Sequence, residues 1–172
     1  MRRILILAAV MLVGAAVQAQ TISPVVSETK IDKKGRAVGN LTVRNDTNYK
    51  EAVTIEAVGV RKNAEGKIEY TDVASGLVVE LSDTSFMLPP HGLRTIYWKT
   101  SGANGQFHVM LFSSFHTMLH TTDGMGVVLK LGASAYGCST KDDLKHCREV
   151  VLRSEGIDPS THQVPPTQAQ GK

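Results

Sequence analysis

The feature of this sequence that most limits its fold is a series of short segments in which apolar and polar residues alternate. Val127–Ala135 shows the pattern clearly, because its odd-numbered residues are all apolar whereas Lys130 and Ser134 are among the even-numbered ones. Neighbouring side chains of a β-strand point to opposite faces of the sheet, so a period of two indicates a strand with one buried face. Turn clusters such as Asn-Asp-Thr-Asn at 45–48 separate the segments.

These segments fill most of the chain between residues 21 and 136. Strands are expected at 22–31, 37–44, 52–61, 68–70, 76–81, 93–99, 107–115 and 127–135. About seven short strands with this spacing are typical of two antiparallel sheets packed face to face. The sequence therefore predicts an all-β sandwich.

The end of the chain follows a different pattern. Thr140–Asp143, with the sequence Thr-Lys-Asp-Asp, has the form of a capping box that opens a helix. Leu144, Cys147 and Val151 then recur at the spacing of one helix face. Gly156 is a suitable residue to end the helix. We therefore predict a short C-terminal helix after the last strand.

The first residues have the composition of a secretory signal peptide. Arg2 and Arg3 are followed by the apolar run Ile4–Val17, and small residues before Gln20 suit a signal peptidase. The run is shorter than the roughly 20 residues that cross a membrane as a helix. We expect cleavage after Ala19 and no membrane span in the mature chain.

Export bears on the only two cysteines, Cys138 and Cys147. An isolated pair in an oxidising compartment is most simply a disulfide, and a metal site would need further ligands where only His146 is adjacent. Four parts are thus expected: the signal peptide 1–19, a sandwich domain 20–137, a disulfide-linked helical segment 138–156, and a disordered, Pro-containing tail 157–172.

Several function classes find no support in the sequence. The formal charge of +3 includes Arg2 and Arg3, so the mature chain is nearly neutral and lacks the basic stripe of a nucleic-acid binder. There is no Gly-x-Ser-x-Gly or His-Glu-x-x-His motif, and no cysteine beside a suitable base. We expect neither an enzyme nor a bound cofactor.

Two His-x-Met pairs leave a metal-binding alternative open. His108 with Met110, and His116 with Met118, are each two residues apart and would share one face of a strand. Imidazole and thioether groups together suit copper. A periplasmic copper-binding protein or copper chaperone is therefore the alternative function.

Three pieces of sequence occur in order: Ile22-Ser23-Pro24, Leu-Thr-Val-Arg-Asn at 41–45, and Phe-Met-Leu-Pro-Pro-His-Gly at 86–92. Together they resemble the N-terminal immunoglobulin-like domain of the periplasmic pilus-assembly chaperones of the chaperone–usher pathway. The resemblance covers residues 21–136. It implies an immunoglobulin-like, seven-stranded β-sandwich in the periplasm.

The resemblance also implies a function. A chaperone of this family lends its last strand to an incomplete pilin sandwich, supplying main-chain hydrogen bonds and a row of apolar side chains. The matching row here is Val127, Leu129, Leu131 and Ala133. The implied partners are pilus or surface-fibre subunits, with an outer-membrane usher as an open possibility.

The family further grips the client's C-terminal carboxylate with two basic residues. By strand position the nearest matches are Lys30 and Lys130, which could act as point charges on a carboxylate. The family normally carries a second sandwich domain, and the gripping cleft lies between the two domains. This chain has the predicted helix and tail there instead, so the resemblance leaves that grip open.

Overall fold

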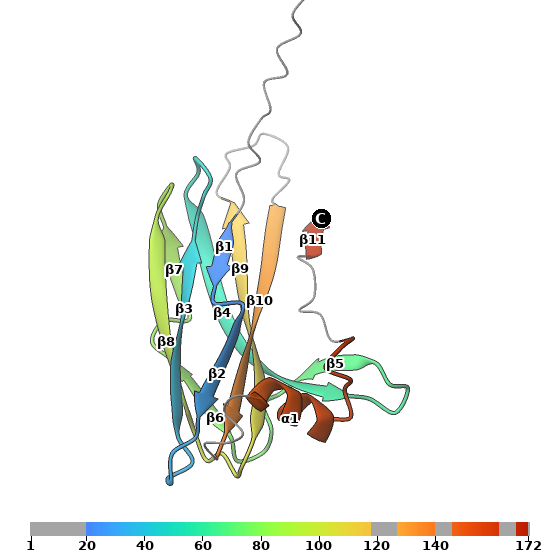
Figure 1. The fold of residues 1–172 in the computed structure, drawn as a ribbon. Helices are drawn as coiled ribbons and strands as arrows, with labels where there is room; N and C mark the ends of the chain where they lie inside the picture. The colour runs from blue at the N-terminus through green and yellow to red at the C-terminus, as the bar shows by residue number, and fades with distance from the viewer. Residues whose placement is uncertain (1–19, 118–126, 140–145, 162–167, 172) are drawn as a thin grey trace, which may run out of the picture.

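The computed structural model describes residues 20–117, 127–139, 146–161 and 168–171. They form two sheets packed as layers, with one helix beside the second sheet (Figure 1). The first sheet contains, in spatial order, β1 (Thr21–Ser23), β3 (Ala37–Arg44), β8 (Leu93–Ser101) and β6 (Val78–Leu81). The second contains β11 (Gln168–Gly171), β10 (Val127–Cys138), β9 (Phe107–Thr117), β4 (Glu51–Lys62) and β5 (Ile68–Thr71). The predicted signal peptide lies outside the described residues.

Two further strands pair with the second sheet. β2 (Val26–Lys30) runs parallel to β10, and β7 (Ser85–Leu88) is antiparallel to β4. The predicted strand 22–31 is thus divided at Pro24, which cannot donate a ladder hydrogen bond. Its first part joins one sheet and its second part the other. β7 lies between the strands expected at 76–81 and 93–99, where no strand was expected, and the described residues form the strands β1–β11 rather than about seven.

Alternation along the strands produces the core between the sheets. In β3, Leu41 and Val43 are buried whereas Asn40 and Arg44 are exposed. Burial of such apolar side chains is the main driving force for packing the two sheets together. The predicted all-β, two-sheet architecture is confirmed. Core side chains that the two sheets contribute include Leu41, Val43, Val53, Leu88, Ile96, Trp98, Val109 and Phe115.

A buried asparagine holds one end of the sandwich together. The Nδ2 of Asn45 donates hydrogen bonds to the carbonyl oxygens of Tyr49 at 2.7 Å and Pro89 at 3.0 Å, and its Oδ1 accepts one from the Thr47 N–H at 2.9 Å. Two of the sequence pieces that suggest the chaperone resemblance, 41–45 and 86–92, therefore meet at this side chain.

The short helix α1 (Cys147–Ser154) covers the outer face of the second sheet near one end of β10 (Figure 1). The predicted disulfide is present between Cys138 and Cys147. Cys138, Tyr136, Val151, Leu152 and Ile157 form a second, smaller apolar cluster between the helix and the sheet. The predicted capping box 140–143 and Leu144 lie outside the described residues.

The helix ends as its sequence predicts. Gly156 has a positive φ of 71°, and its N–H donates to the carbonyl of Arg153 at 3.0 Å. The next N–H, of Ile157, reaches back to the carbonyl of Leu152 at 2.8 Å, so the pair of bonds forms a Schellman motif. The helix is too short to cross a membrane, and no other described helix is long and apolar enough to do so.

The segment 157–172, predicted to be disordered, contains two ordered features. Ile157 is buried in the cluster under α1, and residues 168–171 form β11 along the edge of β10. The tail has a polar sequence that does not indicate a strand. Residues 168–171 are ordered because they form backbone hydrogen bonds with a strand that is already in the sheet.

Candidate functional site at the outer edge of β10

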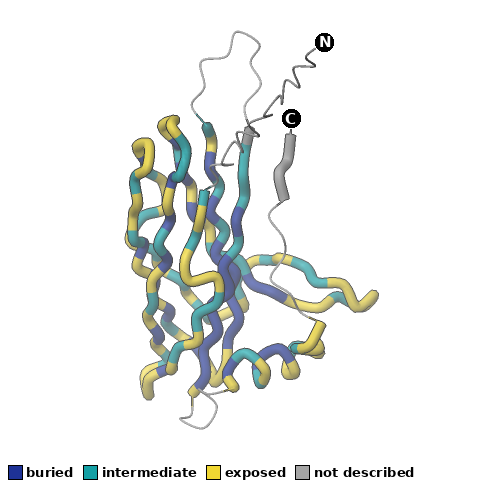
Figure 2. Tube along the Cα trace, turned by 45° about the horizontal axis from the view of Figure 1, so that its top comes forward, coloured by how far each residue is buried: buried dark blue, intermediate teal, exposed yellow. Residues whose placement is uncertain are grey.

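The last strand of the sandwich, β10, lies between two apolar clusters. Leu131, Ala133 and Ala135 point into the main core. Tyr136 and Cys138 point the other way, into the cluster under α1. Burial raises the pKa of the Tyr136 hydroxyl, because ionisation would place a charge in an apolar environment. Figure 2 shows the same difference along the strand, which is buried toward α1 and half-buried toward β11.

This placement changes the role of the predicted donor row. Leu131 and Ala133 are 8% and 3% exposed and belong to the protein's own core. Leu129 is half-buried and packs against that core from its rim. Val127 begins the strand, at the position opposite Gly171. The row therefore changes from buried at Leu131 to half-buried at Leu129, toward the start of β10.

Two segments pair with the outer edge of β10, the side away from β9. β2 pairs in parallel with residues 134–138, and backbone bonds from the Ser134 N–H to Val25 and from the Ile31 N–H to Cys138, each 2.8 Å long, lie at its two ends. β11 pairs antiparallel with residues 127–130. Within the described part of the chain, residues 131–133 have no strand partner on this side. The start of β10 is thus held by a separate, four-residue segment.

The structure does not bring the two candidate lysines together. Lys30 ends β2 opposite Cys138, whereas Lys130 lies eight residues earlier on β10. At about 3.3 Å per residue this is about 26 Å along the strand, so one carboxylate cannot contact both side chains. Lys130 instead forms an ion pair with Glu56, with its ammonium 4.3 Å from the centre of the Phe112 ring. Lys30 is exposed.

The proposed copper ligands are also apart. His108 and Met110 are buried on the outer face of β9, whereas His116 is exposed at the other end of that strand. Met118 lies outside the described residues. Within the described ranges, no three His, Cys, Asp or Glu side chains are grouped so that they could hold a metal ion. The structure gives the copper alternative no support.

His108 has a different set of neighbours, which sequence reasoning missed. Its Nδ1 lies 3.1 Å from a carboxylate oxygen of Glu155, and its ring stacks on Tyr136 with 4.3 Å between ring centres. Its Nε2 lies 3.4 Å from the Ser134 hydroxyl. The period of two predicts one buried face for each strand, but at this end of β9 and β10 the helix α1 covers the other face as well.

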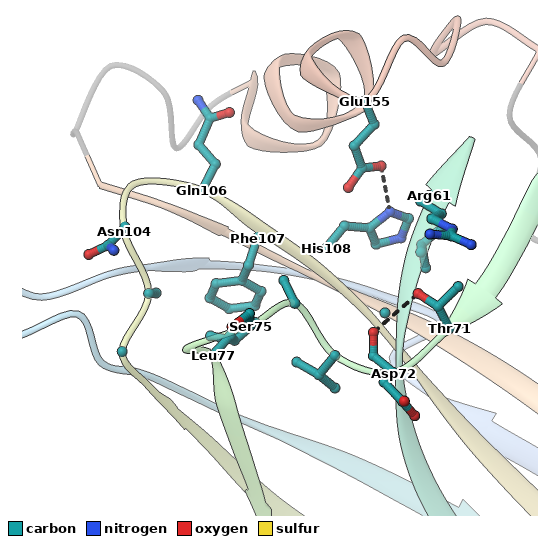
Figure 3. Close-up of a pocket in the computed structure, with 16 residues that line it drawn as sticks. Arg61, Thr71, Asp72, Ser75, Leu77, Asn104, Gln106, Phe107, His108 and Glu155 are labelled. Atoms are coloured by element: carbon teal, nitrogen blue, oxygen red, sulfur yellow. Dashed lines mark hydrogen bonds and ion pairs between the residues drawn. The ribbon is translucent and has the colours of Figure 1, made fainter. Parts of the chain in front are cut away.

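A pocket of about 630 Å³ lies beside this histidine. Figure 3 shows the Glu155 carboxylate pointing toward His108, with the Arg61 side chain beside the imidazole and Thr71 and Asp72 among the other lining residues. Arg61 forms an ion pair with Glu69 at 3.1 Å, and His108 contacts Glu155, so both side chains have partners within the protein. We assign the pocket no function and place the candidate site at the start of β10.

β11 is the element of this site that sequence reasoning missed. Its sequence, Gln-Ala-Gln-Gly, contains no β-branched or aromatic residue and shows no apolar alternation. The one sequence feature that could have indicated β11 is the long apolar strand 127–135. An exposed edge of such a strand pairs readily with other chains, so a covering segment is to be expected.

No family model matches the sequence, and no curated protein matches it. Solved structures do match. The class 5 fimbriae chaperone CfaA has a TM-score of 0.54 and 13% identity, with 72% of this chain and 57% of the CfaA chain covered. A chain of the CsuC–CsuE chaperone–tip adhesion subunit pre-assembly complex of Acinetobacter baumannii pili has a TM-score of 0.51 and 10% identity, with 78% and 67% covered.

The same fold also occurs outside pili. A PapD-like domain of human CEP192 matches with a TM-score of 0.53 and 12% identity, covering 72% of this chain and 86% of that domain. One fold hosts several functions, so these matches bear on architecture and not on activity. The chain has the PapD-like immunoglobulin fold that it shares with the pilus chaperones, as its sequence motifs predict.

Proposed function

We propose that this chain is a periplasmic, chaperone-like protein that binds a pilus or surface-fibre subunit by β-strand addition along the start of β10. The observation that carries the proposal is the outer edge of this strand. β2 covers only its second half, and the first half pairs with a short segment from the chain's own end. An edge of this kind can exchange one strand partner for another.

Strand addition explains why both halves of β10 are built as they are. Leu131 and residues 133–138 are buried and fix the strand in the sandwich. The half-buried Leu129, next to the backbone edge that β11 occupies, can extend the core into a groove on a subunit. Main-chain hydrogen bonds would supply affinity, and the alternating apolar side chains would supply register.

Export is part of the proposal. The composition of Met1–Ala19 is that of a secretory signal, and the disulfide between Cys138 and Cys147 suits an oxidising compartment. Pilus chaperones act on subunits in the periplasm. Binding by a backbone edge needs no catalytic group, so we propose no enzymatic activity.

The experiment uses a pilus subunit that is encoded in the same genome and lacks the last strand of its own sandwich. The mature chain, residues 20–172, is co-expressed with this subunit in the periplasm, and the complex is isolated by size-exclusion chromatography. We expect a one-to-one complex in which the amides at 128–130 exchange more slowly than in the chain alone.

Val128→Lys is the test variant, because a charge on an edge strand opposes strand addition. Thr71→Lys is the matched control, since Thr71 is equally half-buried but lies on β5 at the opposite edge of the same sheet. The proposal predicts loss of the complex for the β10 variant only. Equal complex formation by both variants, each folded by circular dichroism, would show that the subunit binds elsewhere.

A further inference from the structure

The chain's own C-terminal segment occupies the edge to which the subunit would bind. In β11, Gln168, Ala169 and Gln170 lie opposite Lys130, Leu129 and Val128 of β10. We propose that β11 is an internal cover of this edge, which has to leave before a subunit strand can pair with it. The inference rests on the proposed function and adds its regulation.

The sequence of β11 suits a cover that can be displaced. Backbone pairing along four residues satisfies hydrogen-bonding groups on the edge. Stability of a strand pair depends on side-chain contacts as well, to which β-branched and aromatic residues contribute most. Gln-Ala-Gln-Gly has neither kind, so a subunit segment with alternating apolar residues would form the stronger pair.

Covering this edge with β11 would also prevent self-association. Val127-Val128-Leu129 is a run of strand-forming apolar residues on a sheet edge. Such an edge is a template for pairing with a second copy of the same protein. A weak internal strand blocks this self-association and still yields to a better partner.

The start of the tail is anchored, which keeps the cover close. Ile157 is buried under α1 at 6% exposure, and Asp158 accepts hydrogen bonds from the Ser160 N–H at 2.9 Å and the Thr161 N–H at 3.1 Å. The chain is thus fixed up to Thr161, shortly before β11. A tethered segment acts at a high effective concentration, so even a weak pair is well populated.

The experiment compares three proteins. The released form ends at Thr161 and keeps the anchor under α1. The locked form carries Val128→Cys and Gln170→Cys, which lie directly opposite each other. Opposite residues of an antiparallel pair have Cα atoms about 4.5–5.5 Å apart, within the range of a disulfide. The third is the unmodified mature chain, and Gln170→Cys alone with its thiol alkylated is the control for the lock.

The probe is a fluorescein-labelled synthetic peptide of alternating Val and Thr residues, and binding is measured by fluorescence anisotropy. If the cover is closed in nine molecules of ten, the released form binds about tenfold more tightly than the unmodified chain. The locked form shows no binding, whereas its alkylated control binds like the unmodified chain. Amides 128–130 exchange faster in the released form.

The outcomes separate the two proposals. If the released and unmodified chains bind the peptide with equal affinity, or exchange equally at 128–130, the proposal that β11 covers the edge is wrong. The proposed binding by strand addition is then unaffected. Absence of binding to the released form, with faster exchange at 128–130, shows instead that the open edge accepts no strand. That result overturns the proposed function and the regulation that rests on it.

Discussion

The imidazole Nδ1 of His108 lies 3.1 Å from a carboxylate oxygen of Glu155, the residue that follows α1. The contact joins β9 of the sandwich to the end of the helix. The side chain of His108 is fully buried, whereas that of Glu155 is 19% exposed. The helix is therefore held to the sheet at both of its ends, here by a polar contact and at Cys147 by the disulfide.

Removing this contact tests how strongly the helix end is held. We expect His108→Ala and Glu155→Ala each to lower the free energy of unfolding, the first by more because it also removes the stacking on Tyr136. In a double-mutant cycle by urea denaturation the two substitutions are expected to couple by about 1–2 kcal/mol. Additive effects would mean that the contact contributes nothing of its own.

The disulfide between Cys138 and Cys147 closes a short loop, with a sequence separation of 9. Constraining a loop of this length in the unfolded chain stabilises the fold by about 2–3 kcal/mol. The double variant Cys138→Ala/Cys147→Ala is expected to lose that amount in urea denaturation. Reductant should lower the stability of the unmodified chain by a similar amount and leave the variant unchanged, which serves as the control.

The sequence predicted the main strands well where burial alternates. The strand predicted at 37–44 coincides with β3, because one face of β3 is buried and the other exposed. The prediction was poorer where both faces are covered. Around His108 and Tyr136 the outer face lies under α1, and a pattern of period two cannot report which element covers a polar face.

The candidate site was predicted in part. The strand 127–135 was identified, but the side chains that look equivalent in sequence differ in depth, from the core residue Leu131 to the half-buried Leu129. Depth depends on where the opposite sheet ends, which is a tertiary property. β11 was missed because its pairing uses backbone groups, which every sequence has.

That difference in depth gives the next prediction. Leu131→Ala removes a core side chain and is expected to lower the free energy of unfolding by about 2–4 kcal/mol. Leu129→Ala removes a half-buried side chain of the same size at the rim, and about 1 kcal/mol is expected. Urea denaturation of the two variants measures both values. Equal losses would contradict the gradient of burial along β10.

The last prediction concerns Asn45, which is fully buried and bonds to the backbone of Tyr49 and Pro89. Asn45→Ala removes the amide donor from these carbonyl groups, and a loss of about 2–4 kcal/mol is expected. Asn45→Asp keeps an acceptor for the Thr47 N–H but has no amide to donate, and places negative charge beside carbonyl oxygens. We therefore expect it to be at least as destabilising as alanine.

The neighbouring Asn48 is exposed and serves as the matched control for Asn45. Its Oδ1 lies 3.0 Å from the His91 ring, a surface contact. Asn48→Ala is expected to change the free energy of unfolding by no more than about 0.5 kcal/mol. If Asn45→Asp is tolerated as well as Asn48→Ala in urea denaturation, the amide donor bonds do not hold the turn after β3 to the corner before β8. The sandwich end would then depend on apolar packing alone.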